Sequence, residues 1–182
     1  MLLGCLATVL LVVVRHRRKT LWKRRIAKAL KSIGRECLRD VVVPDGVGDY
    51  IHVDYVLLTP HALLVIDVRN YQGAVFGAPR LKQWTRVANG RSHKFDNPLD
   101  QNALRVQSVK ALVPNVPVTG RVVFTEAGYF PKGVPQGVSM LGTLKDDLAA
   151  ALGPGEVPES VLGAWGALKE IARAARARIA AS

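Results

Sequence analysis

Aspartate and arginine side chains occupy strand-like stretches of this sequence in a pattern suited to metal or phosphate chemistry. Asp67 and Arg69 lie two residues apart in the segment VIDVRNYQG, residues 65–73, at the end of an apolar run. Residues i and i+2 of a β-strand share one face of the sheet, so we expect both side chains to point the same way. The pair is either part of a metal-dependent catalytic site or an ion pair within a sheet.

A predicted β-hairpin brings a second aspartate to this pair. Residues 50–58 and 62–70 are two strand-like runs separated by a short turn around Pro60. If the connection contains an even number of residues centred on Pro60 and its successor, Asp54 lies directly opposite Asp67. An odd number would place the two aspartates on opposite faces. The hairpin therefore predicts a carboxylate pair only in the even register.

The same register places His52 opposite Arg69, with all four side chains on one face. Like charges directly across a sheet are unfavourable, so Asp54 and Asp67 require a cation between them. That cation is either a divalent metal, for which oxygen ligands with open water positions suit Mg²⁺, or the guanidinium of Arg69. The residues alone leave both alternatives open.

Residues 40–112 resemble the nuclease-related domain (NERD), a branch of the PD-(D/E)XK nuclease superfamily. The family pattern has an Asp on one strand, then carboxylate-X-Lys followed by Asn-aromatic-X-Gly, later a Trp, and finally Phe-X-Asn-Pro-Leu-X-Gln-Asn. This chain has Asp54, then DVRNYQG at residues 67–73, then Trp84, then FDNPLDQN at residues 95–102. The last segment is the most specific element of the match. The resemblance implies an α/β fold with a restriction-endonuclease-like mixed β-sheet core flanked by helices.

The resemblance also implies Mg²⁺-dependent hydrolysis of a nucleic-acid phosphodiester, with Mn²⁺ as a substitute metal. Asp54, Asp67 and the carbonyl of Val68 would bind the metal, which would activate water and stabilise charge on the phosphate. Arg69 stands where the family has its catalytic lysine, near the attacking water. Gln101 would face the site and position a phosphate or a water molecule.

The chain departs from the family pattern at two places. Arg69 cannot act as a general base because arginine stays protonated at physiological pH, although it can still bind phosphate through two hydrogen bonds. The Gly-Glu that commonly begins the family's first helix is replaced here by Lys-Arg-Arg, and Glu36 lies too near the first strand to replace that acid. Three hypotheses therefore remain: a nuclease with an atypical Asp-X-Arg site, a catalytically inactive nucleic-acid-binding module, or a membrane-tethered protein-interaction domain.

The elements that must position these residues follow an α/β order with a mixed sheet. Apolar alternation and turn residues predict the strands, and helical periodicity with capping signals predicts the helices. The predicted strands are residues 37–44, 50–58, 62–70 and 118–124, with a hairpin over 73–87, and the predicted helices are 99–112, 144–152 and 159–180.

Positive charge is concentrated before this domain. The chain of 182 residues has a net charge of +12, and residues 15–39 contain eleven Lys and Arg against the single acid Glu36. Residues 40–182, the predicted nuclease-related domain, contain 15 basic and 13 acidic residues and are close to neutral. Nucleic-acid-binding proteins usually have a basic surface, so this near-neutrality favours the interaction domain.

The N-terminal residues predict a membrane attachment. Residues 1–14 contain no charged residue and are followed at once by RHRRK. This order suits a hydrophobic anchor with the domain on the cytoplasmic side, because positive flanks stay in the cytoplasm. A buried helix or strand is the alternative. We expect residues 15–39 to form a basic juxtamembrane helix near anionic lipid head groups, with a nucleic-acid tether as the alternative. Its apolar stripe comprises Leu21, Ile26, Ala29, Leu30 and Ile33.

Overall fold

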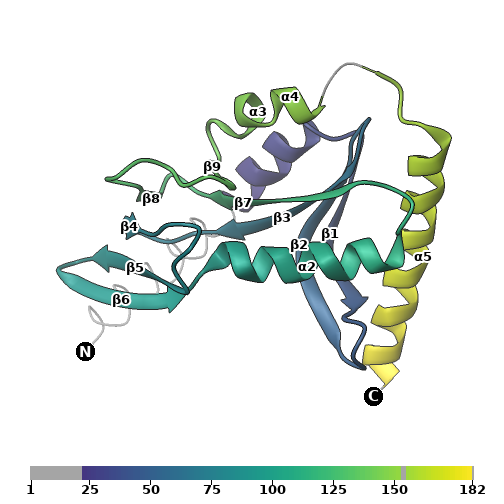
Figure 1. The fold of residues 1–182 in the computed structure, drawn as a ribbon, viewed down its shortest axis with the longest axis horizontal. Coiled ribbons are helices and arrows are strands. Elements are labelled where there is room, and N and C mark those ends of the chain that lie inside the picture. The colour runs from purple at the N-terminus through teal and green to yellow at the C-terminus, as the bar shows by residue number, and fades with distance from the viewer. Residues whose placement is uncertain (1–21, 153–154, 182) are drawn as a thin grey trace, which may run out of the picture.

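In the computed structural model, which describes residues 22–152 and 155–181, a twisted β-sheet lies between helices on both of its faces (Figure 1). The first described element is helical, over residues 22–31. The strands are β1 (Glu36–Pro44), β2 (Tyr50–Leu58), β3 (Leu63–Arg69), β4 (Gly73–Phe76), β5 (Gln83–Ala88), β6 (Arg91–Asp96), β7 (Val118–Phe124), β8 (Gly128–Tyr129) and β9 (Val138–Met140). The later helices are α2 (Pro98–Leu112), α3 (Leu144–Asp147), α4 (Ala149–Leu152) and α5 (Glu159–Ala181).

The central sheet is mixed, as expected for an α/β domain. Its strand order is β1-β2-β3-β7-β9, with β1, β2 and β3 antiparallel and with β7 and β9 parallel to β3. The β2–β3 ladder pairs Tyr55 with Ile66 and Leu58 with Leu63. This is the predicted even register, and it arises because four residues connect the two strands. The predicted register is therefore confirmed, although the ladder ends at Tyr55 and Ile66 and pairs neither Asp54 with Asp67 nor His52 with Arg69.

A second, four-stranded sheet in the order β6-β5-β4-β8 projects from the carboxyl end of β3. Trp84 on β5 is completely buried and stacks on Phe124 of β7 with ring centroids 6.4 Å apart. Gly77 allows this packing, because a Cβ at that position would lie 2.0 Å from the Trp84 ring. Trp84 therefore joins the two sheets. The sequence predicted one hairpin over residues 73–87, whereas the chain forms three strands here, with β6 added at residues 91–96.

Apolar clusters cover both faces of the central sheet. On one face, α2 and α5 contribute Val109, Trp165 and Leu168 to a cluster with β-strand valines. On the other face, Ile26 and Leu30 from the helix at 22–31 pack with residues of β2 and β3 and with the short helices α3 and α4. The predicted bounds of α2, β7 and α5 agree with the structure to within about two residues at each end. The helix predicted over residues 144–152 is divided into α3 and α4, and β8 and β9 were not predicted.

The basic segment departs from the prediction in length and in packing. The helix ends at residue 31 and β1 begins at Glu36, so a helix through residue 39 is wrong, and a boundary at residue 40 would divide β1. Ile26 and Leu30 are buried against the sheet because the domain needs this apolar stripe to cover its second face. Residues 1–14 and Leu21 lie outside the described residues. Within the described part of the chain, no helix is long and apolar enough to cross a membrane.

Candidate functional site

Asp54 and Asp67 lie where β2 and β3 separate. The last ladder pair is Tyr55 with Ile66, and beyond it Oδ2 of Asp54 accepts a hydrogen bond of 2.8 Å from the backbone N–H of Val68. The Asp54 side chain thus takes the place of a partner carbonyl on β2. This side-chain bond opens the sheet at one point and satisfies the N–H that the separation would otherwise leave without a partner.

The guanidinium of Arg69 contacts all of the residues that the sequence assigned to the site. Its Nη1 lies 3.9 Å from Oδ2 of Asp54, and its Nη2 lies 4.0 Å from Oδ2 of Asp67. Nη1 also donates a 3.2 Å hydrogen bond to the carbonyl of Val68, and Nη2 donates one of 2.9 Å to Oε1 of Gln101. The arginine therefore lies at the point where the two carboxylates, the carbonyl and the amide converge.

Gln101 reaches this point because α2 begins at a well-defined cap. The side chain of Asn97 accepts a hydrogen bond from the N–H of Leu99, and Pro98 occupies the first turn, where its missing N–H costs nothing. Asn97 also donates from Nδ2 to the carbonyl of Pro79 in the β4–β5 connection and is almost completely buried. The cap fixes the start of α2 against the second sheet, and Gln101 then projects toward β3.

Arg105 is a site residue that the sequence analysis missed. It lies one helical turn after Gln101, so both side chains share a face of α2. Its Nη1 lies 3.1 Å from Oδ2 of Asp67, closer than Nη2 of Arg69 at 4.0 Å, and its Nε donates a 2.7 Å hydrogen bond to the carbonyl of His52. The i,i+4 spacing from Gln101 was the signal that could have identified it.

The site is balanced in charge without a metal ion. Two carboxylates, on Asp54 and Asp67, lie among two guanidiniums, on Arg69 and Arg105. Asp67 is completely buried, and burial raises the pKa of its carboxyl, while Arg105 and then Arg69 oppose the rise. Its Oδ1 is buried and accepts no hydrogen bond of good geometry among the described residues. Desolvation is thus the largest influence on the Asp67 pKa.

An exposed acidic residue, Asp40, lies beside the site on β1. His52 lies between two carboxylates, with Nδ1 3.7 Å from Oδ1 of Asp54 and Nε2 3.7 Å from Oδ1 of Asp40. Asp40 has a backbone φ of 52°, in the left-handed region that residues other than glycine rarely adopt. Glu36, which the sequence analysis judged too near the first strand to replace the family's helix acid, accepts a hydrogen bond from Trp165 on α5. The site thus holds two central carboxylates, with the exposed Asp40 beside them and His52 between Asp40 and Asp54.

These residues do not fit a bound divalent cation as they lie. The oxygen donors are two carboxylates and one carbonyl, and all three already face the positive charge of Arg69. In the part of the chain that the structure describes, no group of three or more His, Cys, Asp or Glu residues is arranged to hold a metal ion. A divalent ion placed among these oxygens would lie within a few ångströms of a guanidinium and would be repelled by it.

The comparisons with known proteins agree with the sequence motifs. The family model of the nuclease-related domain matches residues 18–125, which is more than half of the chain. The chain belongs to the nuclease-related domain family. Its 25% identity to an uncharacterized protein of Bacillus anthracis extends over 76 residues, 42% of this chain and 36% of that protein. The matched segment thus covers about a third of the relative. No solved structure matches the chain.

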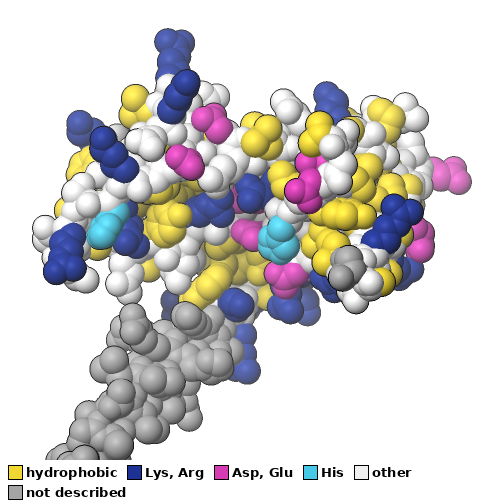
Figure 2. All heavy atoms as spheres, turned by 90° about the horizontal axis from the view of Figure 1, so that it is seen from below, with side chains coloured by type: hydrophobic (Ala, Val, Ile, Leu, Met, Phe, Trp, Pro, Cys, Tyr) yellow, Lys and Arg dark blue, Asp and Glu magenta, His cyan; other side chains and the backbone are white. Residues whose placement is uncertain are grey.

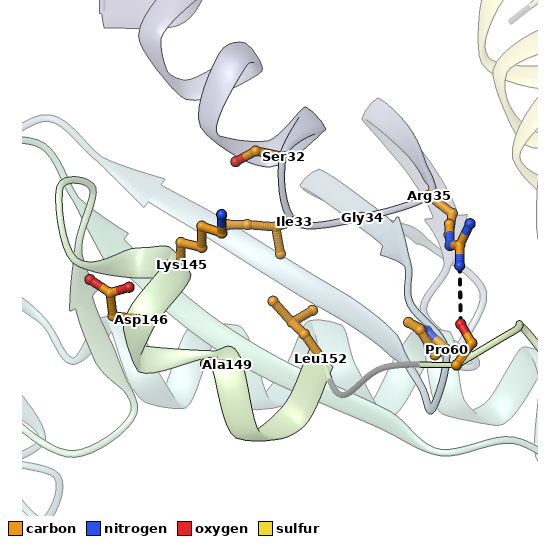
Figure 3. Close-up of a pocket in the computed structure, with 10 residues that line it drawn as sticks. Ser32, Ile33, Gly34, Arg35, Pro60, Lys145, Asp146, Ala149 and Leu152 are labelled. Atoms are coloured by element: carbon orange, nitrogen blue, oxygen red, sulfur yellow. Dashed lines mark hydrogen bonds between the residues drawn. The ribbon is translucent and has the colours of Figure 1, made fainter.

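A separate hollow of about 510 Å³ lies at the β2–β3 connection, where Pro60 lines it (Figure 3). It is lined by the end of the first helix, by Pro60 and by α3 and α4, and Lys145 extends along one side of it. Arg35 donates a 3.0 Å hydrogen bond to the carbonyl of Gly155 at its edge. None of the site residues described above lines this hollow.

Proposed function

We propose that this nuclease-related domain binds nucleic acid without hydrolysing it, and that Arg69 and Arg105 neutralise the two aspartates in place of a metal. The contact of one guanidinium with Asp54, Asp67, the Val68 carbonyl and Gln101 carries this proposal. Two carboxylates that converge in a partly buried site are stabilised by a neighbouring cation, and here the chain provides two of its own.

Hydrolysis would also lack a base at this position. Arginine keeps its proton at any physiological pH, so Arg69 cannot accept one from water. Asp67 is enclosed between Arg69 and Arg105, and Oδ2 of Asp54 is occupied by the Val68 N–H. The site is therefore better suited to holding the β2, β3 and α2 elements together than to activating a water molecule.

The exposed β5–β6 hairpin supports the nucleic-acid part of the proposal. Between residues 79 and 95 the chain has no Asp or Glu. Figure 2 shows Lys and Arg side chains at the end of the molecule that this hairpin forms. The near-neutral charge of residues 40–182 conceals this local excess, and a basic surface of this kind is what a phosphate backbone attracts. The basic residues in this segment are Arg80, Lys82, Arg86, Arg91 and Lys94.

Mg²⁺-dependent hydrolysis is the second candidate. It is favoured by the convergence of Asp54, Asp67 and the Val68 carbonyl, and by the buried Oδ1 of Asp67, which accepts no hydrogen bond of good geometry within the described segments. This function requires the Arg69 side chain to leave the position that it occupies. The chain's membership of the nuclease-related domain family gives this second candidate further support.

We also propose that residues 1–14 attach the protein to a membrane with the domain on the cytoplasmic side. The support is the charge-free apolar sequence followed by the cluster RHRRK at residues 15–19. The helix at 22–31 buries its apolar stripe in the domain and leaves basic side chains such as Lys23, Lys28 and Lys31 exposed. These can lie near anionic lipid head groups, each adding about 1 kcal/mol of attraction close to the surface.

The test is calorimetric titration of the full-length chain with Mg²⁺ and Mn²⁺, combined with cleavage assays on single- and double-stranded DNA and RNA. We expect no saturable metal binding and no cleavage, together with salt-dependent binding of nucleic acid. The control is the Asp54→Ala, Asp67→Ala double variant. Metal binding by the wild type that disappears in this control, accompanied by cleavage, would overturn the proposal in favour of the second candidate.

An Arg69→Lys chain sharpens this test. Lysine has a smaller head group and cannot form the two-pronged contact to Val68 and Gln101. If Arg69→Lys gains metal binding and cleavage while the wild type has neither, Arg69 is what excludes the metal, as proposed.

A further inference from the structure

We infer that a single strand of nucleic acid, with its bases unpaired, lies along three adjacent hollows that run from the β5–β6 hairpin to Asp54. This inference rests on the proposed binding of nucleic acid and adds its strandedness and its path. Neighbouring hollows lie next to each other, because each pair shares a lining residue: Gln72 belongs to the first and second, and Trp22 to the second and third.

The first hollow, of about 360 Å³, provides the positive charge. Arg86 of β5 and Arg91 of β6 line it together with His93, which lies directly opposite Arg86 in the β5–β6 ladder. The Arg86 guanidinium is 5.5 Å from the centroid of the Tyr71 ring, which holds it at the rim near Gln72. Its lining contains two arginines and no acid, so this end is the one that attracts phosphate.

The second hollow, of about 530 Å³, is polar and almost balanced in charge. Asn70, Gln72 and Thr125 line it, along with Arg25 and Glu126. The Thr125 hydroxyl donates a 2.6 Å hydrogen bond to Oδ1 of Asn70, which fixes the orientation of that amide. Uncharged amides and hydroxyls of this kind can donate to and accept from the edges of unpaired bases.

The third hollow, of about 270 Å³, reaches the candidate site. It is lined by Trp22, Lys23, Arg39, Asp54 and other residues. Trp22 is half-buried, and its Nε1 is buried without a hydrogen-bond partner in the described residues. The Lys23 ammonium lies 5.9 Å from the centroid of the Trp22 ring. An indole beside a cation is a platform on which a base can stack.

The distribution of charge and aromatic surface favours a single strand. In the third hollow two acids, Asp40 and Asp54, are matched by two basic residues, so the excess positive charge lies at the hairpin and the aromatic surface of Trp22 lies at the other end. A nucleic-acid base can stack on the Trp22 ring only if one face of the base is uncovered. In a duplex, both faces of each internal base are covered by the neighbouring base pairs. Grooves that combine basic residues with an aromatic platform bind single strands with little preference for sequence.

The experiment uses the full-length chain and measures the affinity for a labelled thymidine oligonucleotide and for a duplex of equal length by fluorescence anisotropy. We expect the single strand to bind more tightly. We expect Arg86→Ala, Arg91→Ala to weaken binding about tenfold and to lower the salt slope by about 1.4, since each single-strand phosphate contact contributes about 0.7. The matched control is Lys110→Ala, Arg178→Ala, which removes two exposed charges outside the three hollows and should leave the affinity unchanged.

Tryptophan fluorescence reports on the other end of the path. The chain has three tryptophans, and Trp84 and Trp165 are buried in the apolar cores. If the oligonucleotide quenches tryptophan fluorescence, the quenching should therefore come from a base that stacks on Trp22. Trp22→Leu should weaken binding about tenfold. Trp22→Phe should restore most of the affinity but abolish the quenching.

Two kinds of failure are distinguishable. Absence of binding to either oligonucleotide would contradict the proposed function itself. Binding that is as tight for duplex as for single strand, or that is unchanged by the substitutions at Arg86, Arg91 and Trp22, would leave nucleic-acid binding in place and overturn the single-strand path.

Discussion

Arginine side chains serve two different purposes in the centre of this domain and in its β5–β6 hairpin. In the centre, Arg69 and Arg105 have only 15% and 21% of their side chains exposed, and both lie against the buried carboxylate of Asp67. In the hairpin, Arg91 is exposed and no acid occurs between residues 79 and 95. The centre therefore uses its cations to satisfy internal charge, and the hairpin leaves its cations available to a ligand. Net charge alone does not distinguish these two uses.

The difference follows from solvation. A buried charge that loses its partner must bear the cost of desolvation alone, so the central residues are coupled to the stability of the fold. An exposed charge is hydrated and screened by salt, so the basic side chains of the hairpin contribute little to the stability of the fold. They can still attract a charged ligand over a distance of about one Debye length. Substitutions should therefore separate the two regions, with stability changing in one and affinity in the other.

The largest effect is expected for Arg105→Met. The substitution keeps much of the apolar stem but removes the cation 3.1 Å from the buried Asp67. Breaking a buried pair in this way typically costs about 3–5 kcal/mol; because Arg69 remains beside Asp67, we expect a loss of about 3 kcal/mol in the free energy of unfolding at neutral pH. The measurement is chemical denaturation of the full-length chain.

Lys110→Met, an exposed substitution on the same helix, is the control and should change this free energy by less than about 0.5 kcal/mol. An Arg105→Met chain as stable as the control would contradict the view that Arg105 neutralises Asp67.

The pH dependence of Arg105→Met gives a second, smaller effect. Burial raises the pKa of Asp67 in the folded chain above the unfolded value of 3.8. Such a group contributes stability that is fully present below the unfolded pKa and is lost as the pH rises through the folded pKa. Without Arg105 the folded pKa of Asp67 rises further, so the stability lost in the variant should be regained as the pH falls from about 7 toward about 4.

The contribution of Asp67 to the pH dependence of stability must be separated from that of other carboxyl groups, whose stabilising effect is lost, not gained, as the pH falls. The pKa values of Glu36 and Asp45 are lowered by hydrogen bonds, so their contributions are lost on acidification. Comparing Arg105→Met with Arg105→Met, Asp67→Asn at each pH cancels them, since both chains retain them. A difference between these two chains that does not vary with pH would show that Asp67 does not titrate in this range.

Much of the fold was predictable because its signals are local. The turn around Pro60 predicted the β2–β3 hairpin and left two registers, and the even one that formed brought Asp54 and Asp67 to one place. Asn97 and Pro98 marked the start of α2. Periodicity and capping depend on residues near in sequence, so one chain is enough to recognise them.

The parts that were missed depend on contacts between distant segments. Arg105 joins the site because α2 packs across β3; the i,i+4 spacing places it on the same helix face as Gln101, but its contact with Asp67 depends on that packing. The stripe containing Ile26 and Leu30 was interpreted as a surface near lipid, although the domain uses it to cover one face of its sheet. The basic hairpin was hidden because the charge was summed over residues 40–182 rather than along the surface.

The smallest effect on stability is expected in the hairpin, for Arg91→Met. Arg91 lies opposite Ala88 in the β5–β6 ladder and its side chain is exposed, so its removal leaves no buried group without a partner. We expect the free energy of unfolding to change by less than about 0.5 kcal/mol, while the affinity for single-stranded oligonucleotide falls in proportion to one lost phosphate contact. Denaturation and anisotropy on the same preparation measure both quantities. A loss of stability comparable to that of Arg105→Met would mean that the hairpin cation is structural, and the contrast between the two regions would then fail.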